Sequence, residues 1–80
     1  MRRISVVIAD RYPVVLLGLM KVLEAHPDFA VVACCTDGIS CIEAMRRLAP
    51  DITVLDLPMS GSNGFEVLNA ANSENLPTRL

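Results

Sequence analysis

The chain of 80 residues is long enough for one small domain, and its formal net charge is −2. Hydrophobic residues make up 52% of it and charged residues 20%, which excludes a disordered tail and a membrane-embedded protein. The longest uncharged run near the start, Tyr12–Met20, falls well short of the ~20 apolar residues of a membrane-spanning helix. The 7 basic residues are scattered among 9 acidic ones, so this segment is not expected to bind nucleic acid by itself.

Two features of the sequence favour a cytoplasmic protein. The start of the chain imitates a secretory signal peptide, but Asp10 and Arg11 interrupt the apolar run and no small-residue cleavage site follows. The cysteines, Cys34, Cys35 and Cys41, are odd in number and show no spacing typical of a metal site. We interpret them as buried, reduced thiols.

Three short apolar runs rich in Val and Ile predict the strands. These runs are Ile4–Ala9, Phe29–Cys35 and Ile52–Leu55. Continuous apolar runs bounded by Asp, Pro or Gly are typical of strands buried on both faces, as in a parallel sheet.

The first predicted helix follows the first strand. Pro13 suits its first position, where the missing N–H costs nothing, and the helix continues over Val14–Ala25 until Pro27 ends it. Over Val14–Leu23, only Gly18 and Lys21 break its apolar surface. We therefore expect the helix at 13–26 to be buried on two sides, by a second copy of the chain or by a further helix, although packing within its own domain is the simpler alternative.

Two more helices are predicted from turn and capping residues. Asp37 can cap a second helix over about Ile39–Leu48, which Pro50 ends. We expect its buried side to be formed by Cys41, Ile42, Met45 and Leu48. A third helix is predicted over about Gly64–Ala71, with Phe65 and Leu68 turned inward.

The alternation of strands and helices predicts a doubly wound α/β fold with a parallel sheet. Residues 76–80 are typical of the approach to a fourth strand. Small domains of this kind need more strands to bury their helices, so we expect residues 1–80 to be the N-terminal part of a longer domain, or to complete the sheet with a partner. An uncovered sheet edge predicts that the isolated chain associates or is poorly stable.

Asp10 and Asp56 are the candidate site residues, because each follows a predicted strand. Sites in doubly wound sheets form beyond the carboxyl ends of the strands. If the two strands are neighbours, the carboxylates converge on one pocket, which favours Mg²⁺, and an Asp beside Mg²⁺ is a competent nucleophile toward a phosphoryl group. The alternative, that both residues only cap turns, has similar weight from spacing alone.

The motifs around both aspartates resemble those of response-regulator receiver domains. Residues 5–10, with Tyr12-Pro13 and Gly18-Leu19, are similar to the start of that family, and residues 51–68 are similar to its phosphoacceptor strand and loop. Thr36-Asp37-Gly38 resembles the NarL/FixJ class, which carries a C-terminal helix-turn-helix of LuxR type. The match covers nearly the whole chain and implies a CheY-like (flavodoxin-like) fold with strand order 2-1-3.

The resemblance implies a function for the chain as part of a two-component transcriptional regulator. Asp56 would accept a phosphoryl group from a sensor histidine kinase, and Asp10, Asp56 and the backbone carbonyl of Pro58 would hold Mg²⁺. Gly61 and Gly64 would let the loop turn tightly beside the site. The domain would be regulatory and not an enzyme, would form a homodimer, and would reach DNA only through a C-terminal domain absent from this chain.

Several residues depart from the family pattern. Arg11 stands where the family has a second acidic residue that binds the metal, and a guanidinium cannot bind Mg²⁺. We expect Arg11 to weaken Mg²⁺ binding and to compete for Asp56 as an ion pair, unless it points to solvent. Ser60 replaces a loop proline, and the family's later Thr/Ser and Lys are not in the chain, so the chain alone is not expected to switch.

Three alternatives stay open. An atypical receiver would act by dimerisation or ligand binding without Mg²⁺-dependent phosphorylation, as Arg11 suggests. A phosphatase with an aspartate nucleophile needs a second Asp two residues after Asp56, where Pro58 stands. A nucleotide-binding half-domain needs a glycine-rich loop after the first strand, which this chain lacks.

Overall fold

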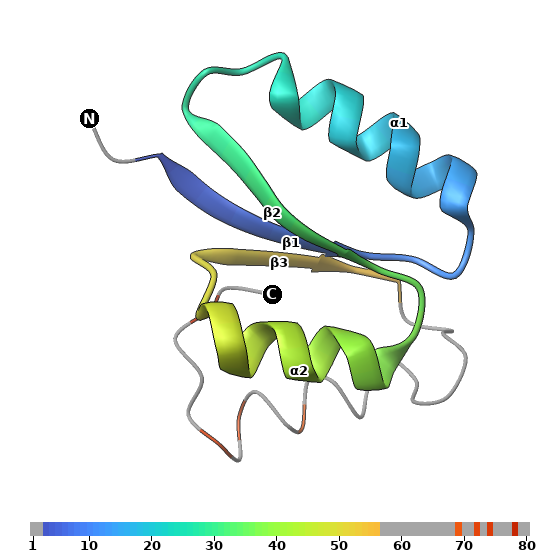
Figure 1. Cartoon of the computed structure of the whole chain (residues 1–80), viewed down its shortest axis with the longest axis vertical. Helices are drawn as coiled ribbons and strands as arrows, with labels where there is room; N and C mark the ends of the chain where they lie inside the picture. The colour runs from blue at the N-terminus through green and yellow to red at the C-terminus, as the bar shows by residue number, and fades with distance from the viewer. Residues whose placement is uncertain (1–2, 57–68, 70–71, 73, 75–77, 79–80) are drawn as a thin grey trace.

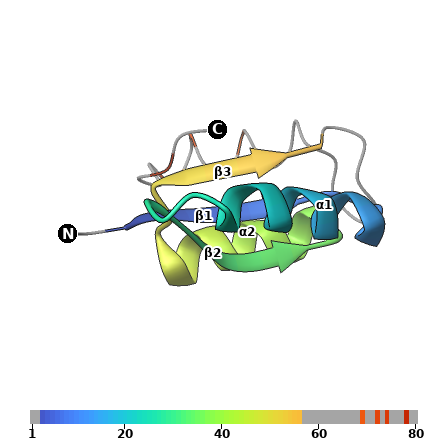
Figure 2. The same cartoon turned by 90° about the horizontal axis from the view of Figure 1, so that it is seen from above.

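The computed structural model describes residues 3–56 together with residues 69, 72, 74 and 78. The elements of this part are strand β1 (Ile4–Ala9), helix α1 (Pro13–Glu24), strand β2 (Phe29–Cys35), helix α2 (Gly38–Leu48) and strand β3 (Ile52–Leu55). The strands form one parallel sheet in the order β2-β1-β3, and the two helices cover its opposite faces (Figures 1 and 2). The predicted α/β fold, its strand order and the three strand ranges are confirmed.

Strand β1 is the centre of the sheet, because it pairs with a strand on each side and packs under both helices. The exposed fraction of each of its last four residues is 2% or less. Val6 and Ile8 lie in the cluster under α1, whereas Val7 and Ala9 lie in the cluster under α2, as the alternation of a strand requires. The prediction of burial on both faces is therefore confirmed for β1.

The outer strands differ from that prediction. The register between β1 and β2 shifts between Val6 and Val7, which pair with Val31 and Ala33, so Val32 is an extra residue in β2. Val32 is 44% exposed, and Val54 on β3 is 39% exposed. Burial on both faces was thus wrong for β2 and β3, each of which has a neighbouring strand on one side only within the described part of the chain.

Helix α1 begins and ends where the proline positions indicate. Pro13 occupies its first turn and Ala25 is its C-cap, which agrees with the predicted range. Leu16 is buried against β1, and Leu19, Met20 and Leu23 are partly buried on the same side. The apolar residues of the outer face are exposed in the single chain; they are Val14, Val15, Leu17 and Val22.

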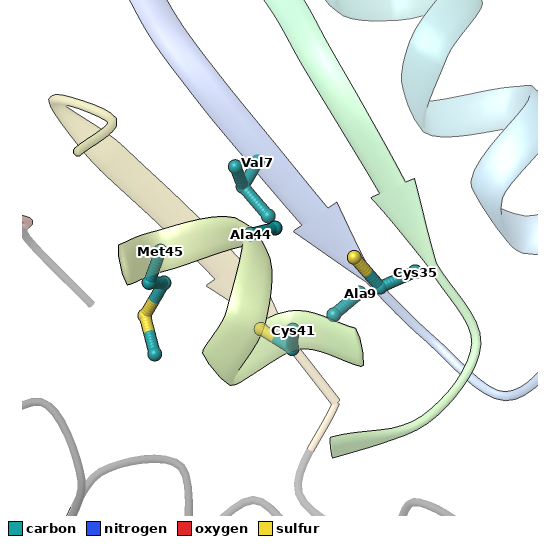
Figure 3. Close-up of a cluster of buried hydrophobic side chains, with 6 residues drawn as sticks. All are labelled: Val7, Ala9, Cys35, Cys41, Ala44 and Met45. Carbon is teal, nitrogen blue, oxygen red and sulfur yellow. The ribbon is translucent and has the colours of Figure 1, made fainter. Parts of the chain in front are cut away.

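Helix α2 packs on the other face of the sheet. The cluster beneath it joins two strands and the helix; its residues are Val7, Ala9, Cys35, Cys41, Ala44 and Met45 (Figure 3). Cys41 and Met45 are fully buried and Ile42 is partly buried, as predicted. Leu48 was predicted to be buried, but it lies in the last turn and is 37% exposed, whereas Ala44 fills the inner face instead.

The cysteines follow the same division between core and surface. Cys35 and Cys41 are buried free thiols, as predicted, but Cys34 is exposed, because its neighbour Cys35 takes the inward position on β2. Burial raises the pKa of Cys41 to about 12, so its thiol stays protonated near neutral pH. The two buried thiols therefore act as small apolar side chains in the core.

A pair of polar residues fixes the amino ends of β1 and β3. The backbone N–H and the hydroxyl of Ser5 both donate to Oδ2 of Asp51, at 2.8 and 3.1 Å. The backbone N–H of Asp51 donates in return to Oγ of Ser5, at 3.0 Å. These reciprocal bonds set the register in which Val6 lies beside Ile52.

The remaining sequence predictions concern segments outside the described residues. The helix predicted over about Gly64–Ala71, with Phe65 and Leu68, falls there except for Asn69, as do most of residues 76–80. Thr78 is described, and its hydroxyl lies 2.8 Å from that of the buried Thr53 on β3. Within the described part of the chain, no helix is long and apolar enough to cross a membrane.

Ala49, the C-cap of α2, is expected to limit the stability of the fold. Ala49 adopts a left-handed backbone with φ of 44°, which strains residues that have a Cβ atom. We expect Ala49→Gly to raise the free energy of unfolding by about 1 kcal/mol, measured by urea denaturation. Ala25→Gly is the matched control, because Ala25 caps α1 with a right-handed backbone and glycine there should not stabilise the protein. Equal effects of the two substitutions would contradict the assignment of strain to Ala49.

Candidate functional site

The candidate site lies at the edge of the sheet where the parallel strands end. Asp10 directly follows β1 and Asp56 directly follows β3. The backbone N–H of Asp56 donates to the carbonyl of Ala9 at 2.9 Å, one step beyond the pairing of Ala9 with Leu55. The two aspartates therefore follow the ends of neighbouring strands. Paired strands usually lie about 4.8 Å apart. The expectation that β1 and β3 are neighbours is confirmed.

Asp10 is half-buried and holds the turn that leads into α1. Its Oδ1 accepts a hydrogen bond from the backbone N–H of Tyr12 at 2.9 Å. Such a bond between an aspartate and the amide two residues later is a common turn, so the turn-capping alternative is observed for this residue. Its Oδ2 accepts no hydrogen bond from residues 3–56, which leaves one carboxylate oxygen for a ligand.

Asp56 is also half-buried, and its backbone is fixed by the bond to Ala9. Within residues 3–56 its carboxylate accepts no hydrogen bond and makes no ion pair. The carboxylate is therefore not committed to a structural role in this part of the chain. Pro58, Ser60, Gly61 and Gly64, to which the sequence assigns the loop after it, lie outside the described residues.

Arg11 is exposed and lies over the ring of Tyr12. Its guanidinium carbon is 4.8 Å from the ring centroid, a cation–π contact. Among the described residues it forms no ion pair with Asp10 or Asp56. The structure thus has the solvent-facing arrangement, and the effect of its charge on metal binding stays a prediction.

Two carboxylates provide oxygen ligands of the type that Mg²⁺ prefers. The described residues hold no group of three or more His, Cys, Asp or Glu side chains able to bind a metal ion. Asp10 and Asp56 therefore carry the right type of ligand atom for Mg²⁺, but they provide only two carboxylates. Arg11 occupies the position where the family has a further acidic residue. Such a pair is expected to bind Mg²⁺ weakly.

Asp37 lies at the same edge, after β2, but serves α2. Its Oδ1 accepts from the backbone N–H of Ser40 at 2.7 Å, and the Ser40 hydroxyl lies 3.0 Å from Oδ2. The backbone bond from Ser40, followed by the hydroxyl bond, lowers the pKa of Asp37. With both oxygens engaged, Asp37 is the helix cap that the sequence predicts and not a metal ligand.

Comparisons with known proteins show the family and the fold of the chain. The model of the response regulator receiver domain family matches residues 6–79. The chain belongs to this family. Among curated relatives of this receiver domain, the nitrate/nitrite response regulator NarP of Escherichia coli is 36% identical over 76 residues. NarL of the same organism, also a nitrate/nitrite response regulator, is 32% identical over 76 residues.

Solved receiver domains share its structure. The signal receiver domain of the response regulator NarL from Mycobacterium tuberculosis superposes with a TM-score of 0.96 at 32% identity, over 99% of this chain and 64% of that one. The isolated receiver domain of RcsB from Salmonella enterica, in the presence of the phosphomimetic BeF3−, gives a TM-score of 0.86 at 26% identity, over 96% and 58% of the two chains. The alignments with NarP and NarL from E. coli include 95% of this chain but only 35% of either relative, so the chain spans about a third of their length.

Sequence reasoning found both aspartates of this receiver domain but missed the role of Tyr12. Tyr12 donates its amide to Asp10, is the N-cap residue of α1 and carries Arg11 on its ring. The signal available was its place two residues after an aspartate that ends a strand, which is typical of a turn closed by a side chain.

The cap formed by Asp37 is expected to make the free energy of unfolding depend on pH in the acid range. Because the folded state lowers its pKa, Asp37 stabilises the fold above its unfolded pKa of about 4 and loses this contribution as the pH falls. We expect Asp37→Asn, which keeps an acceptor oxygen but cannot titrate, to lose less stability than the native chain between about pH 5 and pH 3. Urea unfolding across this range measures the difference. Identical pH profiles for the two proteins would exclude Asp37 as a source of the dependence.

Proposed function

We propose that the chain is the receiver segment of a two-component transcriptional regulator and that Asp56 accepts a phosphoryl group from a sensor histidine kinase. The observation that carries this proposal is the pairing of β1 with β3, which brings Asp56 and Asp10 to neighbouring strand ends. Membership of the receiver family and the likeness to nitrate/nitrite response regulators support it. In this family the receiver domain is regulatory and not a catalyst.

The proposed reaction is a displacement at phosphorus. A carboxylate oxygen of Asp56 attacks the phosphorus of a phosphohistidine on the kinase, the P–N bond breaks and an acyl phosphate forms. The released imidazole nitrogen takes up a proton. The half-buried position of Asp56 at the sheet edge leaves its carboxylate open to such a donor.

Magnesium, when bound, supplies positive charge that offsets the charge of the transferring group. We propose that Asp10 and Asp56 hold it together with the backbone carbonyl of Pro58. Asp10 keeps the turn into α1 in place through Oδ1 and has Oδ2 for the metal. The phosphoryl charge would then bias the packing of the receiver and control dimerisation of an attached DNA-binding domain.

One observation favours a second candidate function. Arg11 replaces an acid in the site, so the chain is a candidate for an atypical receiver that works by dimerisation or ligand binding without Mg²⁺-dependent phosphorylation. The two functions differ in whether Asp56 gains a phosphoryl group.

Intact-mass measurement with Mg²⁺ and acetyl phosphate tests the phosphoacceptor. We expect the native chain to gain the mass of one phosphoryl group and Asp56→Asn to gain none, because the amide is not a nucleophile toward phosphorus. Asp28→Asn, a change of an exposed aspartate before β2, is the matched control and should gain the same mass as the native chain. No gain by the native chain, together with gain by Arg11→Asp, would support the atypical receiver instead.

We also propose that α1 is the contact of a homodimer. Its outer face exposes large apolar side chains, with exposed fractions of 78% for Val14, 59% for Leu17 and 64% for Val22. Contiguous apolar surface of this kind is uncommon on a monomer, and a second copy of the same face is its simplest complement.

Sedimentation across a concentration series tests the homodimer. Burial of one leucine contributes about 1.5–3 kcal/mol, so Leu17→Glu should weaken association at least about tenfold. Glu43→Gln, at an exposed position of α2 on the opposite face of the sheet, is the control and should leave association close to that of the native chain. A native chain that is monomeric at all concentrations, or a Leu17→Glu variant that associates equally well, would exclude α1 as the contact.

A further inference from the structure

The backbone of Arg11 is held in a turn, whereas its side chain is exposed. Its backbone is the middle of the turn that the Asp10 carboxylate closes on the amide of Tyr12, at 2.9 Å. Its guanidinium is exposed and lies over the Tyr12 ring, and it makes no hydrogen bond or ion pair within the described part of the chain. The Arg11 guanidinium thus lies near two aspartates but forms an ion pair with no carboxylate of the described residues.

The backbone brings Arg11 within reach of Asp56. Arg11 immediately follows Asp10, and Asp56 is tied to the residue before Asp10 by the hydrogen bond to Ala9. Standard backbone dimensions, added to the 2.9 Å hydrogen bond between the Asp56 amide and the Ala9 carbonyl, put the Cα atoms of Arg11 and Asp56 no more than about 11 Å apart. An extended arginine side chain can therefore bring its guanidinium to a group carried on the Asp56 carboxylate.

The chemistry of the guanidinium suits a phosphoryl group better than its present contact. Its planar fork of N–H donors matches two phosphoryl oxygens at once, and its charge does not titrate. A cation–π contact at an exposed site is weaker than such a bidentate, charge-assisted pair. A phosphoryl group on Asp56 would add negative charge next to Asp10, at a site with few metal ligands.

We propose that Arg11 leaves the Tyr12 ring to bind the phosphoryl group on Asp56 and supplies part of the positive charge that a metal ion supplies elsewhere. This role rests on the proposed function of Asp56 as phosphoacceptor. It makes modification of Asp56 less dependent on Mg²⁺. It also links the modification to Tyr12, the N-cap residue of α1, and so to the helix that exposes Leu17 and Val22.

The first test measures the rate of phosphoryl mass gain from acetyl phosphate, with Mg²⁺ and with EDTA. We expect the native chain to be modified in EDTA and Arg11→Gln to be modified at least about tenfold more slowly there, since one charged hydrogen-bonded pair is lost. Arg11→Lys, which keeps the charge but not the fork, should lie between the two. Because Arg11 is exposed, all three proteins should unfold at the same urea concentration.

The second test follows the Tyr12 ring. The chain has 1 tyrosine and no tryptophan, so its tyrosine emission reports on Tyr12 alone. Modification of the native chain should change this emission as the guanidinium leaves the ring. Arg11→Gln that has been modified in Mg²⁺, and Asp56→Asn treated with acetyl phosphate, should show no such change. Unchanged emission from fully modified native chain would overturn the movement of Arg11.

The outcomes separate this role from the proposed function. If the native chain and Arg11→Gln gain phosphoryl mass at equal rates under both conditions, the role of Arg11 is overturned and Asp56 remains a phosphoacceptor. If the native chain gains no mass while Arg11→Asp does, Arg11 blocks the site and both proposals fail. Failure of every variant to gain mass also overturns both.

Discussion

The site depends on one short stretch of parallel pairing, between β1 and β3. The last bond of this ladder, from the Asp56 amide to the Ala9 carbonyl, places the proposed phosphoacceptor beside Asp10. Because β1 is buried by both helices, the strand that leads into Asp10 is packed on both of its faces. The core therefore positions one aspartate directly and the other through the backbone of its neighbour.

Much of this arrangement can be predicted from the sequence, because its signals are local. Each strand is a continuous apolar run that ends at a polar or special residue, and the observed ranges match those runs. Pro13 marks a helix start through its fixed backbone and Asp37 through its side-chain cap, both independently of tertiary contacts. Two aspartates that directly follow parallel strands lie at the same end of the sheet, so the pairing of β1 with β3 also predicts that Asp10 and Asp56 are neighbours.

The features that could not be predicted depend on contacts between elements. The extra residue Val32 shifts the β1–β2 register, which no local pattern indicates, and Cys34, two residues further along β2, is exposed. Leu48 has the spacing of the inner face of α2 but lies in its last turn, where the helix has passed the edge of the core. The choice of Arg11 between a carboxylate and the Tyr12 ring is a balance of weak contacts at the surface, which sequence spacing does not decide.

The reciprocal bonds between Ser5 and Asp51 have a consequence at the far end of the strands. A parallel strand that slides past its neighbour must move by two residues for its side chains to keep their faces. Such a slide of β3 would carry Asp56 about 6.6 Å along β1, well away from Asp10. Because these bonds favour one alignment of the two strands over the next, a serine and an aspartate at the amino end preserve the geometry of the proposed site, which neither of them contacts.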